Sequence, residues 1–120
     1  MDRVVDLDEV AGLLVGAAAR WQAIGLDVGP LTWRDAEAEW PQPLGTDRAA
    51  VWDPDSLGVV VVDPAGAELS VVLFRGGWAD VDFMAGPYDA GCLPASDISS
   101  ASDFAGRMER WVERVFGVSG

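Results

Sequence analysis

Two carboxylates separated by one residue are the clearest candidates for chemistry in this chain of 120 residues. Asp80 and Asp82 lie in a segment of alternating character, so on a strand their side chains would share one face. Carboxylate pairs of this kind bind Mg²⁺ or Ca²⁺, or share acid–base work. The spacing supplies no further oxygen ligand, and such alternation is typical of a half-buried strand with one solvated face. We therefore favour a solvent-facing or partner-facing role for the pair over a metal site.

Other reactive side chains lack the partners that catalysis needs. The chain contains no His, the commonest general base and metal ligand. Cys92 is the single Cys, so an internal disulfide and a thiolate zinc site are excluded, and a small buried or half-buried side chain is expected. Residues 99–102 are predicted to cap a helix, and residues 53–56 to form a turn rather than a calcium loop. No catalytic residue, metal or cofactor is expected.

Charge and hydrophobicity narrow the classes of partner. The chain has 8 basic and 20 acidic residues, a net charge of −12, which disfavours nucleic acid and anionic membranes as direct partners. Half of the residues are hydrophobic, which is typical of one folded domain over residues 1–120. The apolar run 10–19 follows an acidic segment, where a signal peptide would be basic, and no run reaches membrane-spanning length. We expect a cytoplasmic protein.

Six Trp residues are several times the ordinary usage for a chain of this length. Trp33, Trp40 and Trp52 lie in or beside irregular, Pro-rich segments. These segments also carry five carboxylates, namely Asp35, Glu37, Glu39, Asp53 and Asp55. Aromatic rings beside carboxylates bind cationic ligands or basic protein surfaces. Burial of the same rings beneath a long loop is an equally good interpretation. Both interpretations stay open for these three residues.

The N-terminal segment is predicted to form an amphipathic helix over about residues 7–24. Asp6 and Glu9 resemble a capping box, and Gly25 is a natural stop. The apolar stripe of this helix comprises Val10, Leu13, Leu14, Ala17, Ala18 and Trp21. Because Trp21 lies on the stripe, we expect it in the core.

A second amphipathic helix closes the chain. Ser100 and Asp103 resemble a capping box at its start, and Gly117 ends it. Its apolar stripe comprises Phe104, Met108, Trp111, Val112, Val115 and Phe116. Trp111 is therefore also expected in the core.

The middle of the chain is predicted to form an antiparallel meander of strands at 57–62, 68–74 and 78–84, joined by turns at 63–66 and 76–77. Weaker signals suggest a strand at 31–33, a helical turn at 35–40, an extended piece at 49–52 and a loop at 88–99.

These elements predict an α+β fold. We expect a two-layer sandwich, a three- to five-stranded antiparallel sheet with the N- and C-terminal helices on one face. Trp78, Asp80 and Asp82 would then lie on the open face of the sheet or on an edge strand.

Residues 74–82 (FRGGWADVD), followed by the closing helix up to Phe116, look like small α+β immunity proteins encoded beside polymorphic toxins in GC-rich bacteria. The resemblance covers about the C-terminal half of the chain and the overall α-β-α layout. It implies a cytosolic inhibitor that binds one cognate toxin domain, blocks its active site and has no catalytic residues of its own.

Our first hypothesis is therefore an immunity protein that binds a basic toxin domain through an acidic, Trp-containing surface. The partner-binding residues expected first are Trp78, Asp80 and Asp82, and those expected second are Trp52, Asp53 and Asp55. Two alternatives remain. One is a regulatory module that binds a small molecule or peptide among Trp33, Trp40, Trp52 and Trp78, and the other is a carboxylate enzyme that uses Asp80 and Asp82. A homodimer through an unpaired sheet edge is compatible with each of them.

Overall fold

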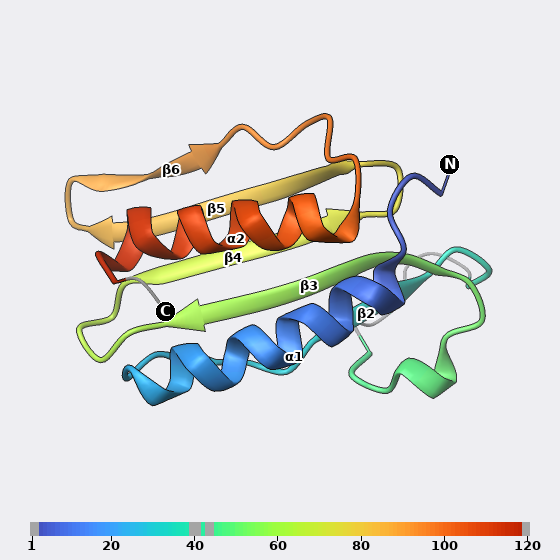
Figure 1. Cartoon of the computed structure of the whole chain (residues 1–120), viewed down its shortest axis with the longest axis horizontal. Helices are drawn as coiled ribbons and strands as arrows, with labels where there is room; N and C mark the ends of the chain where they lie inside the picture. Colours follow the sequence, from blue (N-terminus) through green and yellow to red (C-terminus); the bar gives the residue numbers. More distant parts are fainter. Residues whose placement is uncertain (1–2, 39–41, 43–44, 119–120) are drawn as a thin grey trace.

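A six-stranded antiparallel sheet with two helices on one face forms the computed structural model, which describes residues 3–38, 42 and 45–118 (Figure 1). The elements are α1 (Leu7–Ala23), β1 (Asp27–Val28), β2 (Thr32–Asp35), the 3₁₀ turn η1 (Arg48–Ala50), β3 (Pro54–Val62), β4 (Glu68–Phe74), β5 (Trp78–Gly86), β6 (Asp89–Leu93) and α2 (Ala101–Phe116). Strand β6 forms one edge of the sheet, and β1 and β2 both pair with β3 at the other. The predicted α+β sandwich is confirmed, with six strands where three to five were expected.

Helix α1 begins and ends where its sequence indicates. The Asp6 carboxylate accepts hydrogen bonds from the backbone N–H groups of Asp8 and Glu9, at 3.0 and 3.2 Å. Gly25 follows the helix with a φ of +98°. The predicted stripe is buried except at its margin, where Leu13 is exposed beside a shallow groove between α1 and α2.

Helix α2 is capped as predicted. The Ser100 hydroxyl accepts a hydrogen bond from the backbone N–H of Asp103 at 3.0 Å, and Gly117 adopts a φ of +71°. In place of a reciprocal bond to Ser100, the Asp103 carboxylate accepts from the Ser99 backbone N–H and pairs with Arg107. Both ends of α2 are thereby fixed.

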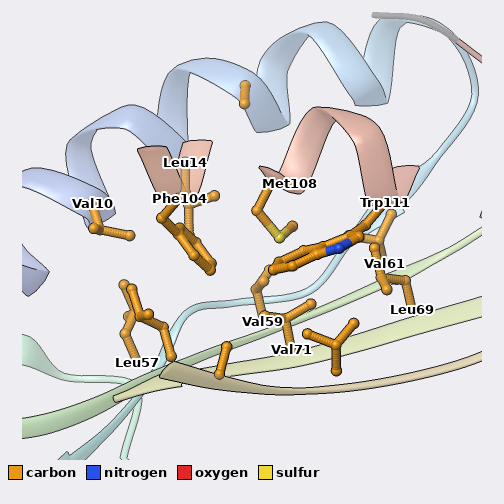
Figure 2. Packing of buried hydrophobic residues seen from close by; sticks show 14 of the residues in the cluster. Val10, Leu14, Leu57, Val59, Val61, Leu69, Val71, Phe104, Met108 and Trp111 are labelled. Atoms are coloured by element: carbon orange, nitrogen blue, oxygen red, sulfur yellow. The ribbon is translucent and has the colours of Figure 1, made fainter. Parts of the chain in front are cut away.

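The core lies between the helices and the sheet (Figure 2). Alternate residues of the three longest strands point toward the helices, and the register places Val59, Val71 and Val81 side by side. From α2, Phe104 meets Trp111 edge to face, with ring centroids 5.9 Å apart. Each fully buried side chain of this size stabilises the fold by roughly 1.5–3 kcal/mol.

The segment before β3 differs from the prediction. Residues 48–50 form a 3₁₀ turn instead of part of an extended piece, and β3 starts at Pro54, so the predicted turn at 53–56 is wrong. Proline is tolerated as the first residue of a strand, where a missing N–H costs little. The chain enters the sheet here because Asp35 of β2 binds the backbone just ahead of β3.

Two further strands lie where no strand was predicted. Residues 89–93 belong to the predicted loop but pair with β5 as β6, and β1 is a two-residue strand beside β3. The sequence of β6 lacks the hydrophobic alternation of a half-buried strand, because its inward positions include Gly91. Its extended conformation depends on pairing with β5.

Candidate functional site

Trp78, Asp80 and Asp82 lie on the sheet surface opposite the helices. We call it the open face. The strand register assigns to it Asp27, Thr32, Arg34, Ser56, Gly58, Val60, Val62, Glu68, Ser70, Val72, Phe74, Trp78, Asp80, Asp82, Met84, Ala90 and Cys92. Both helices lie on the other side of the sheet, so no helix covers this surface (Figure 1).

An exposed indole lies on the open face. Trp78, the first residue of β5, is 41% exposed and stacks on Phe74 of β4, with ring centroids 5.3 Å apart and planes inclined by 17°. Val60 and Met84 are also exposed on this face. Stacking on Phe74 restricts the orientation of Trp78, so the ring is held in place before any partner binds.

The two predicted carboxylates are on the same face. Asp80 and Asp82 are exposed on β5, and the alternate side chains of this strand, Ala79 and Val81, point into the core. The register places Asp80 beside Val72 and Asp82 beside Ser70 and Cys92. The predicted placement of Trp78, Asp80 and Asp82 on the open face is therefore what the structure has.

Cys92 is exposed, so the expectation of a buried or half-buried side chain is wrong. It lies on the edge strand β6, which no described segment covers on its outer side. Its thiol donates a hydrogen bond to the Asp82 carboxylate, with Sγ and Oδ1 2.9 Å apart. This bond and the nearby negative charge raise the pKa of Cys92, which keeps the thiol protonated and a poor nucleophile.

The open face retains its negative charge. Ion pairs with described carboxylates engage six arginines, namely Arg3, Arg20, Arg48, Arg75, Arg107 and Arg114. Asp80, Asp82 and Glu68 take part in none of these pairs. None of these six arginines pairs with the carboxylates that follow Trp78 on β5. The open face also carries Arg34, in the same row as Phe74 and Trp78, but the described carboxylates of this face outnumber this one cation.

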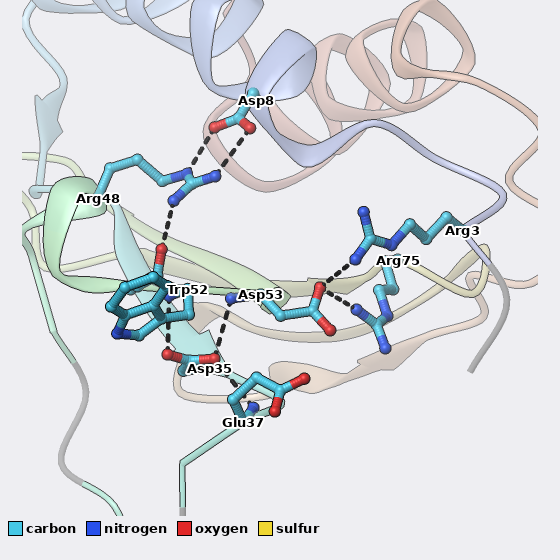
Figure 3. A network of polar contacts seen from close by, with 9 residues as sticks. Arg3, Asp8, Asp35, Glu37, Arg48, Trp52, Asp53 and Arg75 are labelled. Carbon is cyan, nitrogen blue, oxygen red and sulfur yellow. Dashed lines mark hydrogen bonds and ion pairs between the residues drawn. The ribbon is translucent and has the colours of Figure 1, made fainter.

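Trp52, the leading residue of the second predicted group, is 89% exposed at the end of the sheet where β3 begins. It lines a pocket of about 400 Å³ beside the start of α1, together with Arg3, Leu7 and Arg48. Asp53 is less available, because its carboxylate pairs with Arg75 at 2.6 Å and with Arg3 at 2.5 Å (Figure 3). The half-buried Asp55 accepts the backbone N–H of Arg75 through its carbonyl oxygen.

The remaining indoles divide between the core and segments outside the description. Trp21 and Trp111 are buried, as expected for the helix stripes. Trp33 is also buried, because it pairs with Leu57 on the face beneath the helices, whereas Trp78 points to the opposite face. Trp40 lies outside the described residues. Trp33 and Trp78 therefore do not line one pocket.

One of the carboxylates that could have bound a cationic partner is instead buried, and it fixes the backbone beneath Trp52 (Figure 3). Asp35 is 9% exposed and accepts backbone N–H groups from Trp52 at 2.8 Å, Asp53 at 3.0 Å and Glu37 at 2.9 Å. Arg48 supports the same segment, because it donates to the Val51 carbonyl and pairs with Asp8. The exposed Trp52 ring therefore projects from a rigid backbone.

The bonds to Asp35 predict a pH-dependent contribution to stability. Hydrogen bonds from the Trp52 and Glu37 backbone lower the pKa of Asp35 below its usual value. A carboxylate whose pKa is lower in the folded state stabilises the fold at pH values above the unfolded pKa of about 3.9. That stability is lost as the pH falls through the folded pKa. Asp35→Asn should therefore lower the unfolding temperature at pH 7 by several degrees, on the order of 5 °C.

Thermal unfolding of wild type and Asp35→Asn between pH 7 and pH 2 tests this prediction. The two unfolding temperatures should converge at the acid end, where the wild-type carboxyl is also neutral. Asp80→Asn, at an exposed carboxylate, serves as the control and should change stability little. A gap between wild type and Asp35→Asn that persists unchanged to pH 2 would contradict the role given to the ionised carboxylate.

The described residues offer neither a metal site nor a membrane-spanning helix. These residues contain no group of three or more Asp, Glu, Cys or His side chains that could hold a metal ion. No helix among them is long and apolar enough to cross a membrane. Comparisons of the chain with models of protein families, with characterised proteins and with solved structures found no match.

Proposed function

We propose that this chain is an immunity protein, a non-catalytic cytoplasmic inhibitor that binds a basic toxin domain with its open face. The observation that carries the proposal is the exposed Trp78, which stacks on Phe74 and is followed along β5 by the exposed carboxylates of Asp80 and Asp82, neither of which belongs to an ion pair described above. An exposed indole whose orientation is fixed by stacking is the kind of residue that dominates binding energy at interfaces.

The charge of the open face supports a basic partner. Complementary charge accelerates encounter between proteins, and a buried aromatic anchor then slows their dissociation. Toxin domains that act on nucleic acids or nucleotides have basic clefts, which a negatively charged surface can fill in place of phosphate groups. A net charge of −12 makes nucleic acid itself an unfavourable ligand for this chain.

Trp52 gives the proposed interface a second anchor. The register joins Trp78, Phe74 and Ser56 in one row across the sheet, and Ser56 lies two residues after the start of β3. Both exposed indoles therefore lie at the same end of the sheet. Because Asp53 is engaged by Arg3 and Arg75, we assign it the role of holding this segment rather than contacting the toxin.

The test uses the toxin domain encoded beside the gene for this chain. Trp78→Ala should weaken its binding by about 2 kcal/mol, mainly through faster dissociation. The double variant Asp80→Asn/Asp82→Asn should instead slow association and flatten its dependence on salt. Surface plasmon resonance at several salt concentrations separates the two effects.

Val15→Ala is the matched control, because Val15 is an exposed apolar residue on α1, away from the open face. It should leave both rate constants unchanged. The proposal fails if the neighbouring gene encodes no toxin domain, or if the domain binds Trp78→Ala and the double Asn variant as tightly as wild type.

A further inference from the structure

The two edges of the sheet differ in how far their outward backbone N–H and C=O groups are protected from pairing with another strand. At one edge, β1 has two residues, Pro30 interrupts the chain, and the outer side of β2 is bonded to Gly45. The Trp33 N–H donates to the Gly45 carbonyl at 2.7 Å, and the Gly45 N–H returns a bond at 3.2 Å. At the other edge, no described segment pairs with the outer side of β6. Natural sheets usually protect such an edge with Pro, Lys or a covering loop.

The register shows which backbone groups of β6 face outward. The Ala79 N–H bonds to the Ala95 carbonyl at 2.9 Å, directly opposite, in the same pairing that joins Val81 to Leu93. Because hydrogen-bonded and non-bonded pairs alternate in an antiparallel ladder, the backbone groups of Leu93 and Gly91 point toward β5. Those of Ala90 and Cys92 point away from the sheet, and both residues are exposed.

The side chains along β6 determine which charges a strand that pairs with its outer edge should carry. On the open face, the small residues Ala90 and Cys92 leave the Asp82 carboxylate accessible from the edge. On the helix side, a cation already occupies the edge, because Arg114 pairs with Asp89 at 2.9 Å and its guanidinium lies 4.9 Å from the Phe83 ring centre. A strand with basic residues on one face would therefore direct them across Cys92 toward Asp82.

We infer that the partner of this chain adds a β-strand to the outer edge of β6, pairing with Ala90 and Cys92 and placing Lys or Arg side chains toward Asp82. The inference rests on the proposed function for the basic character of the partner. A second copy of this chain is disfavoured as the occupant, because each copy carries a net charge of −12.

The probe is an acetylated and amidated six-residue peptide that alternates Lys and Val. In the expected register, the Lys residues lie opposite Ala90 and Cys92 and donate the bonds to β6, so a peptide N-methylated at its Lys nitrogens is the matched control. Titration into the isotope-labelled full chain, followed by amide NMR, should shift the Ala90 and Cys92 resonances saturably. The N-methylated peptide should bind at least tenfold more weakly.

A pair of protein variants tests the same bonds from the other side. Cys92→Pro removes an outward N–H without removing a bond to β5, and proline is found at such positions in edge strands. It should weaken the peptide at least tenfold, whereas Cys92→Ala, which keeps the N–H, should change the affinity less than about twofold. Circular dichroism establishes that both variants are folded, and the N-methylated peptide gives an answer even if Cys92→Pro is not.

Three outcomes would overturn the inference. The two peptides could bind equally well, or the peptide could shift only the resonances of Trp78 and its neighbours on the open face. Shifts of Ala90 and Cys92 that depend on protein concentration without any peptide would identify a second copy of the chain as the occupant.

Binding of the toxin domain separates this inference from the proposed function. If its binding falls with Trp78→Ala but not with Cys92→Pro, the open-face function stands and strand addition is wrong. If the peptide binds β6 and the toxin domain does not bind at all, the proposed function alone fails.

Discussion

Trp21→Ala is expected to lower the free energy of unfolding by about 4 kcal/mol, whereas Trp52→Ala should change it by less than about 0.5 kcal/mol. Both substitutions remove the same indole, so the difference reports the environment alone. Trp21 is 1% exposed in the layer between α1 and the sheet, and its removal leaves a large cavity. Trp52 is 89% exposed and loses little packing when it is truncated.

Urea unfolding of the two variants and wild type measures this difference. Ile98→Val is a useful intermediate case, because Ile98 is also buried and loses only one methylene group, for which about 1 kcal/mol is expected. Comparable losses for Trp21→Ala and Trp52→Ala would mean that Trp52 packs against the fold in solution. Trp52 would then be unavailable as a second anchor for a partner.

The predictions from sequence succeed where the signal is local. Both helices follow from apolar stripes of helical period and from caps at Asp6 and Ser100. The central meander follows from β-branched runs separated by Gly-containing turns, and the placement of Asp80 and Asp82 follows from alternation within one strand. None of these features requires knowledge of a distant segment.

The predictions fail where a distant partner decides the outcome. Trp33 is buried because β2 lies beside β3. Trp52 is exposed on a segment whose backbone is held by the distant Asp35. Strand β6 exists because β5 supplies its hydrogen-bonding partner. The sequence around Trp33 and Trp52 is compatible with a buried or an exposed indole, so it does not decide between the two interpretations of these residues.

The division of charge between the two sides of the sheet connects the fold with the proposed interface. Ion pairs of Arg20 with Glu109 and of Arg114 with Asp89 join α2 to α1 and to β6. Arg107 joins α2 to the loop before it by donating to the carbonyl oxygens of Ser96 and Asp97. Arg48 and Arg75 serve the segments around η1 and β3 in the same way. These arginines thus hold elements together. On the open face Asp27, Glu68, Asp80 and Asp82 outnumber Arg34, which leaves a net negative charge for a partner to neutralise.

Gly77→Ala is expected to destabilise the fold by about 3 kcal/mol, because two costs add at this position. Gly77 has a φ of +97°, which an L side chain adopts only at a cost of about 1 kcal/mol or more. A Cβ added there would also lie 2.8 Å from the Ile98 carbonyl oxygen. The backbone has little freedom to move away, since the Gly77 carbonyl accepts the Ile98 N–H at 2.9 Å. Overpacking of this kind costs about 1–3 kcal/mol.

Gly66→Ala separates the two costs. Gly66 has nearly the same backbone conformation, with a φ of +92°, but no atom lies within 4 Å of the position of an added Cβ. Its substitution should therefore cost only about 1 kcal/mol in urea unfolding. Equal losses at the two glycines would show that the contact with Ile98 relaxes freely. Because Gly77 immediately precedes Trp78, a folded Gly77→Ala protein should also bind the toxin domain more weakly, whereas Gly66→Ala should bind it as wild type does.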